Sequence, residues 1–114
     1  MTFRRGDIVV VPFPFAEKRA SKKRPAVVIS SDRYNASASD VIVAQITTRL
    51  ASAPRPGDHI LRDWQGAGLR APSLVRARLA TLHESVVLAK LGSMPATEMM
   101  DIDKGLGSAL GLDT

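Results

Sequence analysis

VIVAQITT, residues 41–48, is the stretch that decides how this 114-residue chain folds. It is rich in β-branched residues, which favour extended backbone. Its apolar start is continuous rather than alternating, which is typical of a strand buried on both faces. The stretch therefore predicts a β-strand in the interior of the fold.

Two further strands are expected before this one. DIVVVPFPF, residues 7–15, is β-branched and aromatic. Because Pro12 and Pro14 have no N–H to donate, this strand is expected to end at a sheet edge or to run along one. PAVVIS, residues 25–30, is expected to form the second strand.

Polar and turn-forming residues separate the strands. The expected connections and the remaining strands are a positively charged loop at 16–23, a turn-rich segment at 31–40 that can hold a helical turn, a loop at 51–57, a short strand at 59–61, a turn at 64–68 and a strand at 73–82.

The last segment has helical periodicity instead. Apolar residues recur at helical spacing from Met99 to Leu110, and Pro95 suits a first helical turn. Gly105 and Gly107 each cost about 1 kcal/mol relative to Ala inside a helix, so this helix must depend on packing. Short strands followed by one helix predict a mainly β fold, a small barrel or twisted sheet with the C-terminal helix packed across it. The length of the chain predicts a single domain over residues 1–114.

Charge is unevenly distributed along the chain. The formal net charge is +5, but residues 1–55 carry ten Lys/Arg against four Asp/Glu, whereas residues 56–114 carry six against seven. A clustered basic face attracts phosphate backbones or acidic proteins. A solvated basic surface with no partner is the alternative interpretation.

Several classes of site are excluded or disfavoured by composition. The chain has no cysteine, which excludes disulfides and thiolate chemistry and suits a reducing cytoplasm. No apolar run reaches the roughly 20 residues of a membrane span. His59 and His83 stand 24 residues apart without a ligand cluster near either, so neither a metal site nor a cofactor is expected.

Three stretches in order resemble the MazF/PemK family of toxin endoribonucleases. They are RGDIV at 5–9 followed by PFPF at 12–15, KRPAVVIS at 23–30, and IVAQITT at 42–48. Similar residues continue to Leu112. The resemblance implies a small SH3-like β-barrel of the CcdB/MazF type with a C-terminal helix, usually in a homodimer. It also implies metal-independent cleavage of single-stranded RNA in the cytoplasm and neutralisation by a small acidic antitoxin encoded nearby.

Arg24 and Thr47 are the catalytic candidates that the resemblance implies. A guanidinium is planar, permanently charged and able to hold a phosphate with two N–H bonds, and Pro25 biases Arg24 toward extended backbone. The hydroxyl of Thr47 can donate to a phosphoryl oxygen, and Thr48 is a less favoured substitute for it. Without the resemblance, Arg24 reads as a solvated arginine ending a basic loop, and Thr47 as an ordinary strand threonine.

Other basic residues are candidates for contacts with the RNA backbone. They are Lys18, Arg19, Lys22 and Lys23 before Arg24, and Arg76 and Arg78 on the 73–82 strand, where alternation puts both on one face. Each of the four loop residues is equally well explained as part of a solvated charged loop. Many relatives have an acidic residue or Gln near position 78, which this chain lacks. Glu17 is a candidate for proton transfer.

A second hypothesis is that the chain has the same fold but no ribonuclease activity. The altered loop at 16–23 and the arginine at position 78 suit a non-catalytic module. Such a module binds nucleic acid through its basic rim, or it targets gyrase as the CcdB-type toxins do.

Overall fold

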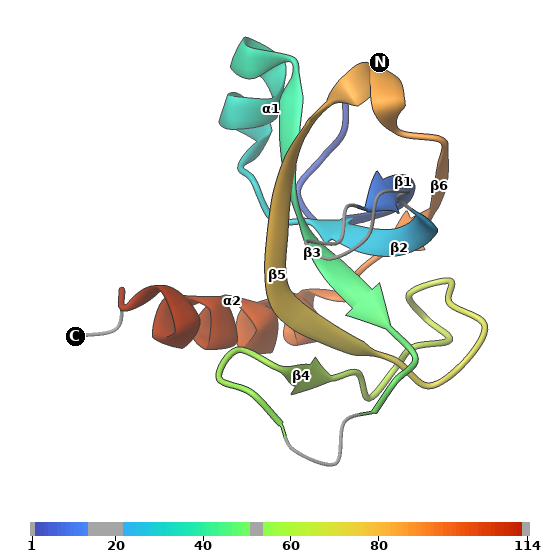
Figure 1. Cartoon of the computed structure of the whole chain (residues 1–114), viewed down its shortest axis with the longest axis vertical. Helices are drawn as coiled ribbons and strands as arrows, with labels where there is room; N and C mark the ends of the chain where they lie inside the picture. Colours follow the sequence, from blue (N-terminus) through green and yellow to red (C-terminus); the bar gives the residue numbers. More distant parts are fainter. Residues whose placement is uncertain (1, 14–21, 51–53, 113–114) are drawn as a thin grey trace.

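The computed structural model of the chain describes residues 2–13, 22–50 and 54–112, and Figure 1 shows their arrangement. One antiparallel sheet has the strand order β4-β5-β3-β2-β1-β6. The strands are β1 (Asp7–Phe13), β2 (Lys22–Val28), β3 (Asp40–Thr47), β4 (His59–Ile60), β5 (Leu74–His83) and β6 (Ala89–Ser93). The helices are α1 (Asp32–Ala38), the 3-10 turn Glu84–Val86 and α2 (Ala96–Leu110). The sheet is strongly curved, as β5 shows in Figure 1, and α2 packs across one of its faces, so the fold is the predicted half-barrel with a C-terminal helix.

β3 lies in the middle of this sheet, between β2 and β5. Alternation sends Ala44 and Ile46 to the face covered by α2, and Val41 and Val43 to the opposite face. Each face has its own hydrophobic core, so the strand is buried on both sides, as its continuous apolar start predicts. On the α2 face the core includes Met99, Ile102 and Leu106, whereas Leu110 at the helix end is 55% exposed.

β1 is an interior strand for half of its length. It pairs with β2 from Ile8 to Phe13, and with β6 from Asp7 to Val10 only. Of the two predicted alternatives, β1 therefore ends at an edge and does not run along one over its whole length, and Pro12 lies beyond the last residue paired with β6. Pro14 lies outside the described residues.

Two elements differ from the prediction. β2 begins at Lys22, three residues before Pro25, because its pairing with β1 extends to Phe13. β6 was missed, since four of its five residues are exposed and no alternation of apolar and polar residues marks it. The helical turn expected in 31–40 is α1, and the hydroxyl of Ser31 caps it by accepting from the N–H of Tyr34 at 3.1 Å.

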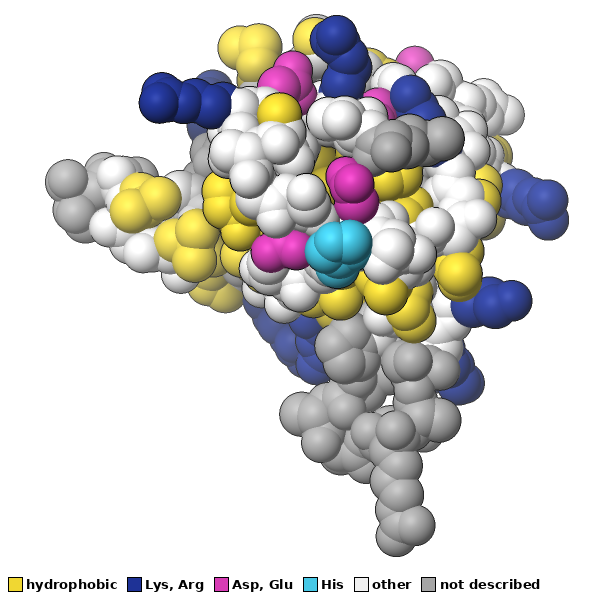
Figure 2. Space-filling view, turned by 90° about the horizontal axis from the view of Figure 1, so that it is seen from above, with side chains coloured by type: hydrophobic (Ala, Val, Ile, Leu, Met, Phe, Trp, Pro, Cys, Tyr) yellow, Lys and Arg dark blue, Asp and Glu magenta, His cyan; other side chains and the backbone are white. Residues whose placement is uncertain are grey.

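The face seen in Figure 2 lies at right angles to the view of Figure 1. Lys and Arg side chains project around its rim, and hydrophobic and acidic side chains lie nearer its middle. This face therefore shows no continuous basic surface among the residues that the structure describes. Neither helix is long and apolar enough to cross a bilayer, for the part of the chain described.

Candidate active site

The antiparallel register of β2 and β3 directs Arg24 and Thr47 toward the same end of the sheet. The paired residues are Ala26 with Gln45, Val27 with Ala44 and Val28 with Val43. If this register is extended by two residues beyond the last pair, Arg24 comes opposite Thr47, and side chains directly opposite each other share a face. Two residues that lie 23 positions apart in the sequence are thus carried to the same end of neighbouring strands.

Thr47 is buried at the last position of β3, with 8% of its surface exposed. Its Oγ1 accepts a hydrogen bond from the backbone N–H of Arg49 at 3.1 Å. That bond holds the oxygen in place and uses its acceptor side, so the hydroxyl proton is available for donation to another oxygen.

Arg24 is half-buried near the start of β2, and its Nε is buried. It lies opposite Val11 of β1, whose pairing positions its backbone. The preceding Lys22 and Lys23 are exposed. One half-buried guanidinium and two exposed ammonium groups thus follow one another at the start of β2, which is an arrangement that attracts phosphate.

A pocket of about 380 Å³ opens beside this pair. It is lined by the start of β2 from Lys23 to Pro25, by Thr48, by residues of the 68–73 segment, and by Val10 and Leu91. Arg70, in the 68–73 segment, adds a further exposed cation to the lining. The sequence reasoning missed both the pocket and Arg70, because only the folded chain brings the 68–73 segment to β2.

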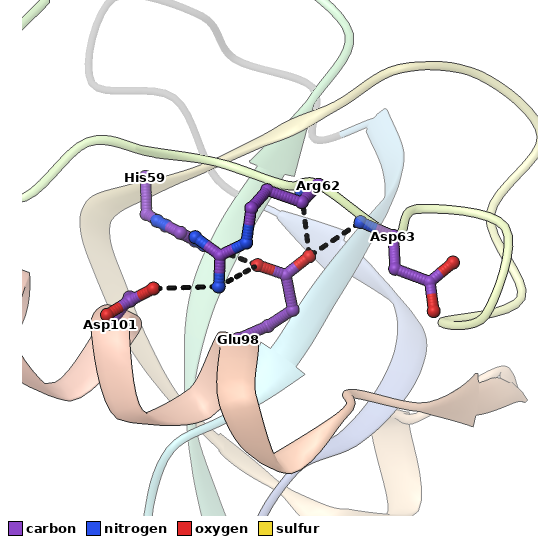
Figure 3. A network of polar contacts seen from close by, with 5 residues as sticks. All are labelled: His59, Arg62, Asp63, Glu98 and Asp101. Atoms are coloured by element: carbon purple, nitrogen blue, oxygen red, sulfur yellow. Dashed lines mark hydrogen bonds and ion pairs between the residues drawn. The ribbon is translucent and has the colours of Figure 1, made fainter.

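Glu98 holds the beginning of the segment that forms this wall (Figure 3). It lies in the first turn of α2 with 1% of its surface exposed, and its Oε2 accepts from the backbone N–H groups of Arg62 and Asp63 at 2.7 Å each. Its Oε1 lies 2.8 Å from Nε2 of His59. Arg62 bridges Glu98 and Asp101, at 3.5 Å and 2.9 Å.

The pKa of Glu98 reflects this network. Burial alone would raise it, but the hydrogen bonds from the Asp63 N–H, from His59 and from the Arg62 N–H outweigh burial and lower the pKa below its usual range. Glu98 is therefore a buried anion at physiological pH. An acid in the first turn of a helix is favoured by the helix dipole, and that position alone does not reveal the burial of Glu98.

Glycines bring the same segment into direct contact with β6. A Cβ on Gly68 would lie 2.7 Å from the carbonyl oxygen of Leu91, and a Cβ on Gly92 would lie 2.5 Å from that of Ala67. The two backbones thus pack with no room for side chains between them. Gly68 also has a φ of +86°, which disfavours any other residue.

Trp64 packs against the hydrophobic core on the α2 face.

Arg76 and Arg78 lie on β5, outside the pocket lining. The guanidinium of Arg76 forms a bidentate pair with Asp58, with Nε–Oδ1 at 3.0 Å and a second bond to Oδ2 at 2.9 Å. The hydrogen bond from Arg76 lowers the pKa of Asp58. Between the pairs Ala44–Leu79 and Ile46–Val75 the register shifts, so the regular alternation behind the shared-face prediction is interrupted. Contact of either arginine with RNA stays a prediction.

The remaining candidates are placed as follows. Lys18, Arg19 and Glu17 lie outside the described residues. His83 accepts from the backbone N–H of Ser85 in the 3-10 turn. Across residues 2–13, 22–50 and 54–112, no three His, Asp or Glu side chains gather in a group able to hold a metal ion.

Comparison with known proteins places this geometry in a family. The family described as "PemK-like, MazF-like toxin of type II toxin-antitoxin system" matches residues 4–110. The chain is 34% identical over 100 residues to "Endoribonuclease MazF6" of Mycobacterium tuberculosis, covering 87% of this chain and 88% of that protein. It is 29% identical over 112 residues to "Endoribonuclease MazF" of Staphylococcus epidermidis, covering 96% and 92%.

Solved structures agree in fold. MazF from Deinococcus radiodurans superposes with a TM-score of 0.77 at 26% identity, covering 97% of this chain and 98% of that one. A mycobacterial endoribonuclease solved with its cognate antitoxin superposes with a TM-score of 0.78 at 21% identity, covering 97% of both chains. The sheet, the C-terminal helix and the sequence match over 4–110 together show that this chain belongs to the PemK-like, MazF-like toxin family.

Proposed function

We propose that this chain is the toxin of a type II toxin–antitoxin system and that it cleaves single-stranded RNA endonucleolytically in the cytoplasm. The observation that carries the proposal is the β2–β3 register, because its extension by two residues beyond the Ala26–Gln45 pair would set Arg24, which follows Lys22 and Lys23 on β2, opposite Thr47. The matched relatives, which are named endoribonucleases, support the reaction class.

The proposed reaction uses the RNA's own nucleophile. The 2′-OH attacks the adjacent phosphorus, a new O–P bond forms, and the bond from phosphorus to the 5′-oxygen breaks. The products are a 2′,3′-cyclic phosphate and a 5′-OH, so the proton lost by the 2′-OH balances the proton gained by the leaving oxygen. No metal takes part in this scheme.

Arg24 and Thr47 stabilise the charge that develops in this step. The guanidinium donates to the phosphoryl oxygens, and the Thr47 hydroxyl, held by the Arg49 N–H, donates to the same group. Lys22 and Lys23 hold the neighbouring phosphates. Glu17 remains the candidate for proton transfer.

The test is cleavage of a long single-stranded RNA in the presence of EDTA. We expect Arg24→Ala and Thr47→Val each to reduce the single-turnover rate by about 10²–10³, the usual effect of removing a transition-state donor. Arg33→Ala, which removes an exposed cation on α1, should cleave like the wild type. Equal cleavage by wild type and Arg24→Ala would exclude the role of Arg24.

We further infer that an acidic, partly disordered antitoxin segment covers the basic site, and that the chain forms a homodimer. Charge complementarity supports the first inference. A small core that gains from additional burial supports the second. An acidic peptide from the neighbouring gene should compete with RNA, and light scattering measures the oligomeric state. Growth arrest with intact RNA would instead favour the non-catalytic alternative.

A further inference from the structure

The pocket beside Arg24 has a lining that suits the flat ring of a nucleobase. Val10, Pro25, Leu69 and Leu91 supply aliphatic walls, and Leu91 is 44% exposed although it is apolar. The volume, about 380 Å³, is within the range of pockets that hold small organic molecules. Bases that leave the stack of a single strand are held between apolar and aromatic side chains.

The polar groups of the lining decide which base fits. Lys23, Arg70 and Thr48 offer N–H and O–H donors, and no Asp or Glu is among the described residues of the lining. At the base edge that faces the major groove of a duplex, guanine and uracil present only acceptors, whereas adenine and cytosine present an amino group that needs an acceptor. Charged donors without a carboxylate therefore favour the two keto bases.

The position of the pocket links it to the cut. Arg24 belongs to the lining, and Thr48 follows Thr47 directly. A base in the pocket therefore lies against the start of β2, the segment that carries Arg24. The three cations Lys23, Arg24 and Arg70 complement the phosphates on either side of such a base, which favours RNA over an apolar protein side chain as the occupant.

The wall that carries Arg70 is fixed before any ligand arrives. Gly68 packs on β6 backbone to backbone, and the N–H groups of Gly68 and Leu69 donate to the carbonyls of Gln65 and Trp64 at 3.0 Å each. Preorganised walls reduce the entropy lost on binding and sharpen selection.

We propose that this pocket binds one unstacked base of the substrate and selects guanine or uracil there, with Arg70 as a specificity-determining residue. The inference rests on the proposed ribonuclease function and names the feature of the substrate that decides where it is cut.

The first experiment compares Arg70→Gln with Arg33→Gln, which removes the same charge from α1. Sequencing of the 5′-OH ends from a long RNA reports the base preference at every position around the cut. The wild type should prefer guanine or uracil at one position, and Arg70→Gln should reduce that preference about fivefold or more, while Arg33→Gln should leave it unchanged.

The second experiment fills the pocket. Leu91→Trp should abolish the preference and raise KM for the preferred site about tenfold, whereas Leu88→Trp, at a 52% exposed position before β6, should do neither. Circular dichroism verifies folding. If Leu91→Trp does not fold, Arg70→Gln still decides the question.

Binding separates this inference from the proposed function. If the wild type leaves RNA intact, cleavage is refuted, and the pocket is then judged from the affinities of oligonucleotides that differ only in one base. Variants that leave both cut pattern and oligonucleotide preference unchanged overturn the proposal. The proposal is also overturned if Arg70→Gln and Leu91→Trp change the affinity for the antitoxin but not the base preference.

Discussion

Arg24 is paired with Val11 of β1, so its contribution can be tested by a substitution that keeps this strand pairing. Arg24→Lys keeps the positive charge but loses the planar fork that grips two phosphoryl oxygens. We expect the single-turnover rate to decrease about tenfold or more, with KM for RNA within about twofold. An increase of KM alone would show that Arg24 contributes binding rather than stabilisation of the transition state.

Glu98 should matter for stability rather than for chemistry. Glu98→Gln replaces a buried anion that accepts from two backbone N–H groups, and hydrogen bonds to a charged group contribute about 1.5–3 kcal/mol each. We expect a loss of about 2 kcal/mol in the free energy of unfolding at pH 7, measured by urea denaturation. Asp103→Asn on the same helix breaks only an exposed pair with Arg5 and should change stability by about 0.5 kcal/mol or less.

The same residue gives the protein a defined sensitivity to acid. The folded-state pKa of Glu98 is lowered, so its stabilisation is complete above the unfolded-state pKa of about 4.3 and is lost as pH falls through the folded value. Asp58, lowered by Arg76, acts in the same direction. Unfolding free energy should thus decrease below about pH 5, and Glu98→Gln should make that decrease shallower. An identical pH profile for the variant and the wild type would contradict this assignment.

Among the elements, α2 offers a matched pair of glycines. A Cβ on Gly105 would lie 3.1 Å from the carbonyl oxygen of Gly57, whereas a Cβ on Gly107 would meet nothing within 4 Å. Gly107→Ala should raise the unfolding free energy by about 0.5–1 kcal/mol through helix propensity. Gly105→Ala should lower it, because the close approach of the 57–58 loop must open. Thermal denaturation measures the stability of the two variants. Stabilisation by both substitutions would show that the 57–58 loop moves away from the helix at little cost.

Some helices and strands could be predicted from the sequence and others could not. β3 and α2 were predictable because a continuous apolar run and a helical period each report burial directly. β6 was not, since its exposed residues are positioned by pairing with β1 rather than by their own pattern. The start of β2 depended in the same way on the pairing of Lys22 with Phe13, which no local signal encodes.

Only some residues of the candidate site could be predicted from the local sequence. The ordered motifs made Arg24 and Thr47 candidates, and the β2–β3 register directs both toward the same end of the sheet. The partners of Glu98 lie 35 to 39 positions away and are mostly backbone N–H groups, which leave no mark in a sequence. RNA contact of Arg76 stays a prediction, and its pairing with Asp58 was not predictable because that residue, 18 positions away, comes beside it only in the fold.

For the whole molecule, the basic site predicts a strong dependence of RNA binding on salt. Each phosphate contact to a single strand contributes a slope of about −0.7 to log K against log salt. Replacing Lys22 and Lys23 with Gln should therefore make the slope shallower by about 1.4. Fluorescence anisotropy across a salt series measures this slope, with both lysine substitutions made in the Arg24→Ala variant so that the RNA is not cleaved. An unchanged slope would place these lysines away from the RNA backbone.

The segment from Arg62 to Ser73 is tied down by Glu98 at its start and by the contact between Gly68 and Gly92 in its middle. Neither attachment involves Arg24 or Thr47. If Arg70 selects the base as proposed, a substitution in this segment changes what is recognised and leaves β2 and β3 as they are. We therefore expect, in evolutionary terms, that single mutations in this one loop give new target sequences without loss of catalysis.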